Sequence, residues 1–126
     1  MKRKIYEQLV LWKEHEQGKV ALLIEGARRV GKSYIVEEFA QKEYKSYILV
    51  DFAHITKPLK RVFDDYLEET ETFFMYLQHV TGKKLYPRES LIIFDEIQKY
   101  PRARQAIKHL VADGRYDFHA ARPKSI

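Results

Sequence analysis

The segment from Gly26 to Ser33 constrains this chain more than any other, because it fits the spacing G-x-x-x-x-G-K-[ST] at every fixed position. An apolar run at 20–24 leads into it and predicts a buried strand. The apolar positions at 35–40 that follow it predict a helix. Strand, glycine loop and helix in this order indicate a nucleotide-phosphate site rather than an ordinary glycine-containing turn. The residues of the segment are Gly26, Ala27, Arg28, Arg29, Val30, Gly31, Lys32 and Ser33.

Each part of this segment has a physical role in holding phosphate. Gly26 and Gly31 permit backbone angles that let successive N–H groups point inward. The N-terminus of the following helix adds unpaired N–H groups and a positive end. We expect the Lys32 ammonium to lie against the outer phosphates. The Ser33 hydroxyl is expected to complete the coordination of Mg²⁺, which prefers oxygen ligands.

Two carboxylates directly follow the most apolar run of the chain. The run Leu91 to Phe94 is uniformly apolar, as a strand buried on both faces should be, and it ends in Asp95 and Glu96. We expect Asp95 to hold Mg²⁺, usually through water, and Glu96 to orient and deprotonate the attacking water. A glutamate beside the metal aspartate indicates hydrolysis of ATP. Such a pair is also a common way to leave a sheet, and the upstream phosphate loop favours the functional interpretation.

Other polar candidates are weaker. Gln98, just past the carboxylates, could sense the terminal phosphate or cap the following loop, and the sequence leaves both roles open. The histidines show no spacing with acidic residues that is typical of a metal site, so surface or partly buried roles are favoured. They are His15, His54, His79, His109 and His119.

The composition fits one globular domain. A chain of 126 residues, 45% of them hydrophobic, has enough length and apolar content for a single core. No apolar run approaches the length of a membrane span, so no membrane partner is expected. The chain has no cysteine. This excludes disulfides, thiol nucleophiles and thiolate metal sites, and it fits a cytoplasmic protein.

The net charge of +5 comes from scattered basic segments. They are residues 1–4, the pair Arg28 and Arg29, and the cluster Arg102, Arg104 and Lys108. These segments could face nucleic acid, but they form no long basic block and no nucleic-acid-binding motif. A solvated basic surface, with charge that offsets bound phosphate, is the favoured interpretation.

Elsewhere the sequence pattern alternates strands with helices. Apolar residues at helical spacing predict helices at about 1–16, 58–67, 72–80 and 101–112, besides the one after the phosphate loop. Apolar runs predict strands at 47–51 and 91–94, and residues 116–118 begin a fourth. This alternation implies an α/β fold with a parallel sheet covered on both faces. The phosphate-site residues then fall at the carboxyl edge of the strands, where such sheets bind ligands.

Three motifs together resemble one family. They are residues 26–33, Phe94-Asp95-Glu96-Ile97-Gln98, and Pro101-Arg102-Ala103 with Ile107-Lys108. The family is the AAA-type P-loop ATP-binding proteins of bacteria and archaea, whose longer chains carry a poorly characterised C-terminal domain. The doubled arginine inside the loop and the glutamine after Asp-Glu make the resemblance more specific than one to a generic ATPase. It runs from the N-terminal helix to about Phe118, and it implies ATP, Mg²⁺ and a three-layer sheet of order 5-1-4-3-2.

The resemblance ends before the sequence does. After Phe118 the family would continue an apolar fourth strand and a polar sensor, whereas residues 119–126 contain Pro123, which is unsuited to a central strand. We therefore expect one domain over 1–126, with an N-terminal helix at about 1–16, a nucleotide-binding core at about 19–118 and an out-of-pattern tail at 119–126. In this interpretation the chain is a truncated or frameshifted member with a partial sheet that lacks the C-terminal strands.

These observations favour an ATP-binding module with Mg²⁺-dependent hydrolysis. Lys32 and Glu96 would be its catalytic residues, and Ser33 and Asp95 would hold the metal. Hydrolysis is expected to be weak, because the sensor and arginine finger that stabilise charge in the family have no counterpart in the sequence. The alternatives are an ATP-switched module associated with nucleic acid, and a non-functional remnant. A homo-oligomer is compatible with the resemblance.

Overall fold

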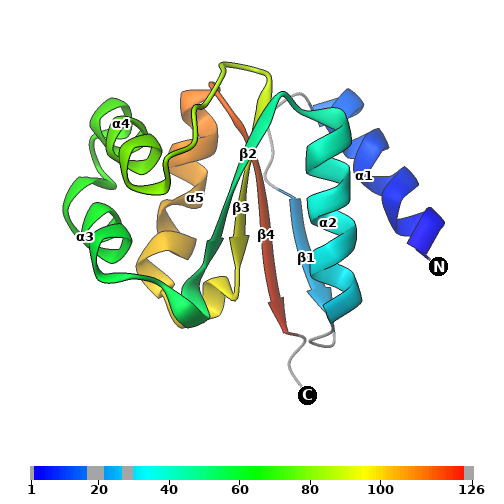
Figure 1. The fold of residues 1–126 in the computed structure, drawn as a ribbon, viewed down its shortest axis with the longest axis horizontal. Helices are drawn as coiled ribbons and strands as arrows, with labels where there is room; N and C mark the ends of the chain where they lie inside the picture. The colour runs from blue at the N-terminus through cyan, green and yellow to red at the C-terminus, as the bar shows by residue number, and fades with distance from the viewer. Residues whose placement is uncertain (1, 17–21, 27–29, 124–126) are drawn as a thin grey trace.

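The computed structural model is a parallel β-sheet between two layers of helices (Figure 1). The structure describes the backbone of residues 2–16, 22–26 and 30–123 and the side chains of residues 6–14 and 36–118. The α-helices are α1 (Lys2–Glu16), α2 (Val30–Glu43), α3 (Lys57–Tyr66), α4 (Thr70–Thr81) and α5 (Pro101–Asp113). The strands are β1 (Leu22–Gly26), β2 (Ser46–Asp51), β3 (Ser90–Asp95) and β4 (Asp117–Pro123). Two short 3₁₀ helices follow β2 and β3, namely η1 (Phe52–His54) and η2 (Ile97–Lys99).

The four strands run parallel in the order β1-β4-β3-β2. β3 lies between β2 and β4, and β4 lies between β3 and β1. Parallel strands have their carboxyl ends at the same edge of the sheet, so all four loops that follow the strands start there. The α/β class is confirmed, and so is the order of the first four strands that the family resemblance implies.

The fourth strand extends further than the sequence pattern predicts. Residues 119–123 of β4 pair in register with residues 22–26 of β1. The first five residues of the tail expected at 119–126 are therefore part of the sheet. Pro123 is the last residue of the strand, where its missing N–H interrupts no later bond of the ladder. Residues 124–126 lie outside the described residues.

Proline and glycine set the limits of three helices. Pro58 and Pro101 occupy the first turns of α3 and α5, where a missing N–H leaves no intrahelical bond unmade. Gly82 and Gly114 end α4 and α5 with φ angles of 70° and 78°. This left-handed conformation favours glycine, and it lets each glycine N–H donate to a carbonyl of the last helical turn. The predicted limits of these three helices agree with the structure to within two residues.

Both faces of β3 are buried. Leu91 and Ile93 pack in a hydrophobic cluster with α1 and α2, whereas Ile92 and Phe94 pack in a second cluster with α3, α4 and α5. Successive side chains of a strand point to opposite faces, so this division follows from the backbone. The prediction of a doubly buried strand is confirmed.

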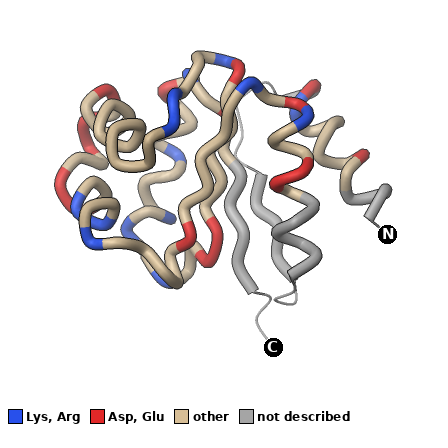
Figure 2. The backbone as a smooth tube through the Cα atoms, viewed as in Figure 1, with Lys and Arg blue, Asp and Glu red and all other residues tan. Residues whose placement is uncertain are grey.

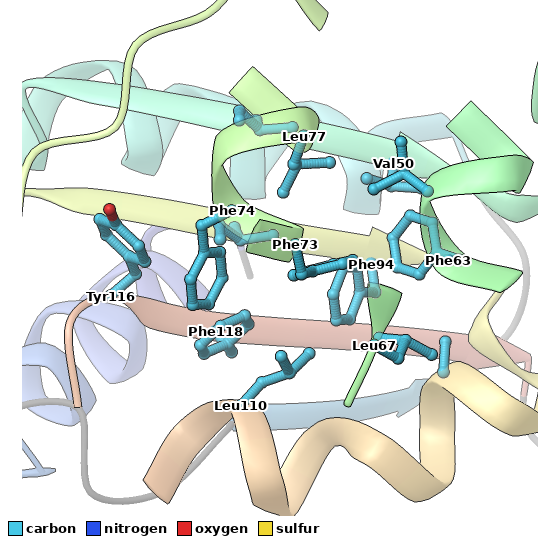
Figure 3. Close-up of a cluster of buried hydrophobic side chains, with 14 of the residues drawn as sticks. Val50, Phe63, Leu67, Phe73, Phe74, Leu77, Phe94, Leu110, Tyr116 and Phe118 are labelled. Atoms are coloured by element: carbon cyan, nitrogen blue, oxygen red, sulfur yellow. The ribbon is translucent and has the colours of Figure 1, made fainter. Parts of the chain in front are cut away.

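The cluster on the α3–α5 face is built largely from aromatic rings (Figure 3). Phe63 of α3 makes edge contacts with Phe73 and Phe94, with ring centroids 5.2 Å and 5.8 Å apart. Phe74 of α4 makes a similar contact with Tyr116, at 4.7 Å. Such pairs add roughly 0.5–1.5 kcal/mol to the free energy gained by burial. These contacts hold α3 and α4 against the sheet.

A buried carboxylate is neutralised at the amino edge of the sheet. Asp117, the first residue of β4, is only 3% exposed. Its carboxylate accepts hydrogen bonds from the Tyr44 hydroxyl and from Arg88 Nη2, the latter at 2.7 Å. Arg88 Nη1 also donates to the carbonyl of Gly114 at 3.2 Å. These contacts fix the start of β4 against the end of α2 and the loop between α4 and β3.

We expect Tyr44 to make stability fall at high pH. Burial, followed by the hydrogen bond to Asp117, raises the pKa of Tyr44 above its ordinary value of 10.0. Above pH 10 the unfolded chain therefore loses this proton while the folded chain keeps it. The free energy of unfolding should then decrease by up to about 1.4 kcal/mol per pH unit for this group. Urea unfolding between pH 7 and 11 measures the slope.

The matched variant is Tyr44→Phe. It should cost about 1–2 kcal/mol at pH 7, because buried Asp117 loses a donor, and it should show a shallower decline above pH 10. Tyr86→Phe, which leaves the bonds of Asp117 intact, is the control. An unchanged slope in Tyr44→Phe would contradict the prediction.

Candidate functional site

The candidate site lies at the carboxyl edge of the sheet. The register aligns Asp51 of β2 with Asp95 of β3, and Asp95 with Ala121 of β4. Ala121 is in turn aligned with Ile24 of β1, two residues before Gly26. Strands about 4.8 Å apart therefore place Asp95 about 10 Å across the sheet from β1. β1, which leads into the glycine loop, and β3, which ends in Asp95, therefore finish at the same edge of the sheet.

The backbone on either side of the glycine loop is that of a strand and a helix. β1 ends at Gly26 and α2 begins at Val30. β1 ends two residues later than the predicted run of 20–24. Residues 20 and 21 of that run, and residues 27–29 of the loop, lie outside the described part of the chain. Residues 30–33 form the first turn of α2, where N–H groups have no acceptor within the helix. The side chains of Lys32 and Ser33 are not among the described ones, so their roles stay predictions.

Two aspartates end neighbouring strands at this edge. Asp95 ends β3 and Asp51 ends β2, and Figure 2 shows acidic residues where these two strands finish. Asp51 Oδ1 accepts the N–H of Ala53 at 3.0 Å, and His54 Nδ1 lies 3.0 Å from Asp51 Oδ2. Asp51 follows an apolar run just as Asp95 does, but no second carboxylate follows it, so the sequence alone does not mark it as a site residue.

Glu96 adopts a backbone conformation that is rare for residues other than glycine. Its φ angle is 59°, in the left-handed region, and the residue is only 6% exposed. This conformation costs on the order of 1–3 kcal/mol, and such strain often occurs at functional sites. The turn after β3 thus holds Glu96 away from bulk solvent next to Asp95.

Gln98 hydrogen-bonds with Glu96. Its Nε2 donates to Glu96 Oε1 at 3.0 Å. The next helix, α5, has Tyr100 as its N-cap and no side-chain capping bond. Of the two roles that the sequence leaves open for Gln98, capping of the following segment is therefore not observed.

Tyr100 anchors the turn that carries Glu96 and Gln98. Its ring stacks on Phe52 of η1, with centroids 5.5 Å apart, and its hydroxyl donates to Asp64 of α3. The N–H of Tyr100 also donates to the carbonyl of Ile97 at 3.0 Å, and Ile97 is buried. Packing of η1 and α3 therefore holds the turn in place.

The described side chains include no group of three or more His, Cys, Asp or Glu residues that could hold a metal by themselves. In a nucleotide site, Mg²⁺ usually takes only one or two carboxylates and completes its shell with phosphates and water. The aspartates at the ends of β2 and β3 are oxygen donors of this kind. No helix in the described part of the chain is long and apolar enough to cross a membrane.

The comparison with protein families decides the assignment. A family model described as an AAA domain matches residues 18–122. The chain belongs to this family. A comparison with curated proteins finds no match.

The limits of the AAA-domain match differ from the expected ones. The match begins at residue 18, so it excludes α1, and it ends at residue 122, so it includes nearly all of β4. The resemblance is confirmed by the match, which covers residues 18–122 where the expected range ran from the N-terminal helix to about Phe118. The pairing of β4 with both of its neighbours gives the physical reason at the second limit.

We expect Tyr100→Phe to destabilise this AAA domain by about 1–2 kcal/mol. The substitution keeps the ring that stacks on Phe52 but removes the hydroxyl donor of the partly buried Asp64 carboxylate. Urea unfolding of the purified chain measures the loss. Asp64→Asn, which keeps an acceptor for the hydroxyl, should cost less. Equal stability of Tyr100→Phe and the parent chain would show that this bond does not support the turn.

Proposed function

We propose that this chain binds ATP and hydrolyses it with the help of Mg²⁺. The observation that carries the proposal is that β1 and β3 end at the same edge of the sheet. β1 leads through the glycine loop into α2, and β3 ends in Asp95, which Glu96 follows. Membership of the AAA-domain family supports nucleotide binding and ATPase activity. A chain without cysteine suits the cytoplasm, where ATP is plentiful.

In this proposal the first turn of α2 binds the phosphates. Its N–H groups and the positive end of the helix favour an anion there. Lys32, in the same turn, would neutralise the outer phosphates as a point charge. Loop residues 26–31 would supply further N–H donors through their backbone.

The metal would lie between the loop and the end of β3. Ser33 and Asp95 would hold it through oxygen, the ligand type that Mg²⁺ prefers. When bound, Mg²⁺ would neutralise the charge that develops on the phosphates during transfer. Asp51, aligned with Asp95 in the neighbouring strand, would add negative potential to the same edge.

Glu96 would accept the proton of the attacking water. Its burial keeps the carboxylate away from bulk solvent, and its position next to Asp95 places it beside the metal. A correctly placed general base contributes about 10²–10⁴-fold to the rate.

The test separates binding from hydrolysis. In calorimetric titrations with Mg²⁺-ATP, we expect Lys32→Ala to weaken binding by at least ~10-fold, or about 1.4 kcal/mol. Glu96→Gln should bind ATP as the parent does, but its release of phosphate should fall by about 100-fold or more. Lys60→Ala, which removes an exposed charge of α3, is the control. Equal binding by Lys32→Ala and the parent would contradict the proposed phosphate site.

Binding of nucleic acid is a second candidate function, favoured by the exposed face of α5. Figure 2 shows basic residues along this helix. The exposed residues of α5 are Pro101, Arg102, Arg104, Gln105, Lys108, His109 and Ala112. They include three cations and no acidic side chain, so this face attracts phosphate backbones.

Salt dependence tests this second candidate. We expect binding to a duplex to weaken as salt is added, and Arg102→Gln/Arg104→Gln to lower the slope of log K against log salt by about 2, one unit per lost contact. Lys83→Gln/Lys84→Gln removes the same charge from exposed positions after α4 and should leave the slope unchanged. Equal slopes in the two double variants would exclude α5 as the binding face.

A further inference from the structure

Within the described part of the chain, the side chain of Gln98 has a hydrogen-bond partner at one end only. Its Nε2 donates to Glu96 Oε1 at 3.0 Å. Its Oε1 is buried and has no hydrogen-bond partner among the described residues. If the amide of Gln98 were turned by 180°, its oxygen would face the carboxylate oxygen of Glu96, and two acceptors cannot hydrogen-bond. The carboxylate therefore favours the orientation in which Nε2 faces it.

This arrangement does not serve stability. A buried acceptor without a donor is penalised, because it has given up its hydrogen bonds to water. The other buried acceptor in the described residues that lacks a hydrogen bond, Asp113 Oδ2, at least lies 3.0 Å from Arg115 Nε. Gln98 Oε1 has no such compensation from the described side chains. The side chain of Gln98 is therefore unfavourable for folding. Its hydrogen bond to the buried carboxylate of Glu96 explains its presence better than a role in the fold does.

The backbone of Glu96 gives a second, independent reason for an orienting partner. Glu96 lies in the left-handed region, and the turn around it is closed by a bond from the Lys99 N–H to the Glu96 carbonyl at 3.0 Å. The backbone of Glu96 is therefore fixed, and its side chain is buried. The amide of Gln98, two residues further along the same turn, donates to Oε1 of the carboxylate and so adds a restraint on its orientation.

We propose that Gln98 is a positioning residue for ATP hydrolysis, acting by holding the carboxylate of Glu96 in the orientation that receives the proton of the attacking water. The proposal rests on the proposed function. In this proposal Gln98 acts through Glu96 and makes no contact with the nucleotide. The side chain acts on the chemical step and leaves nucleotide binding to the phosphate loop.

The test compares Gln98→Met with Gln105→Met, which makes the same substitution at an exposed position of α5. We expect Gln98→Met to lower kcat by at least ~10-fold, because a general base that is oriented less firmly loses part of its contribution. Its dissociation constant for Mg²⁺-ATP and its KM should stay within twofold of the parent values. Its midpoint of thermal unfolding should be unchanged or higher, because methionine removes the unpaired oxygen. Gln105→Met should match the parent in all four measurements.

Each outcome bears on the proposal. A kcat for Gln98→Met within twofold of the parent value would overturn the role of Gln98 and leave the ATPase intact. A fall in kcat together with a lower unfolding midpoint, or with weaker ATP binding, would make the role structural and would also overturn it. If the parent chain binds ATP but releases no phosphate, hydrolysis and the role of Gln98 both fall while the binding site stands. If the parent chain does not bind ATP at all, the proposed function itself fails.

Discussion

The complete desolvation of β3 is the constraint on which the rest of the structure depends. This strand pairs with β2 on one side and β4 on the other, and helices cover both of its faces. No charged side chain can replace Leu91 to Phe94 without losing its hydration. Asp95 is the first position where the chain can carry a charge, so the place where the strand ends also determines where the acidic part of the site begins.

The helices between β2 and β3 support the site as well as the core. Phe63 of α3 packs on Phe94 of β3 and on the ring of Tyr100, with centroids 5.8 Å and 6.0 Å apart. Tyr100 follows directly after η2, the turn that bears Gln98. A shift of α3 would therefore move the turn beside Glu96, although α3 contributes no residue to the two sequence motifs. The aromatic cluster explains how a short, strained turn can keep one conformation.

Sequence reasoning succeeds here where one strong local signal acts alone. The apolar run of β3, and Pro58, Gly82 and Gly114 at helix ends, each determine their own segment, and a strand and a helix flank the glycine loop as predicted. Reasoning from the sequence fails where pairing outweighs composition. Residues 119–123 contain a proline and no large apolar side chain, yet β1 pairs with all five of them and β3 pairs with residues 119–121. The bond between Gln98 and Glu96 depends on the left-handed turn, which no residue type in this segment signals.

The two edges of the sheet differ in the surroundings of their buried polar groups. At the amino edge, buried Asp117 has a hydroxyl donor and a guanidinium donor, so its charge is compensated and the start of β4 is held firmly. At the carboxyl edge, Glu96 has a left-handed backbone and Gln98 Oε1 finds no hydrogen-bond donor among the described residues. Natural selection for stability alone would remove the second pair of defects, since a glycine at 96 and an apolar residue at 98 would each relieve one. Both features lie in a single turn, directly after the strand that carries Asp95. Together they distinguish a site under functional constraint from an ordinary turn at the end of a strand.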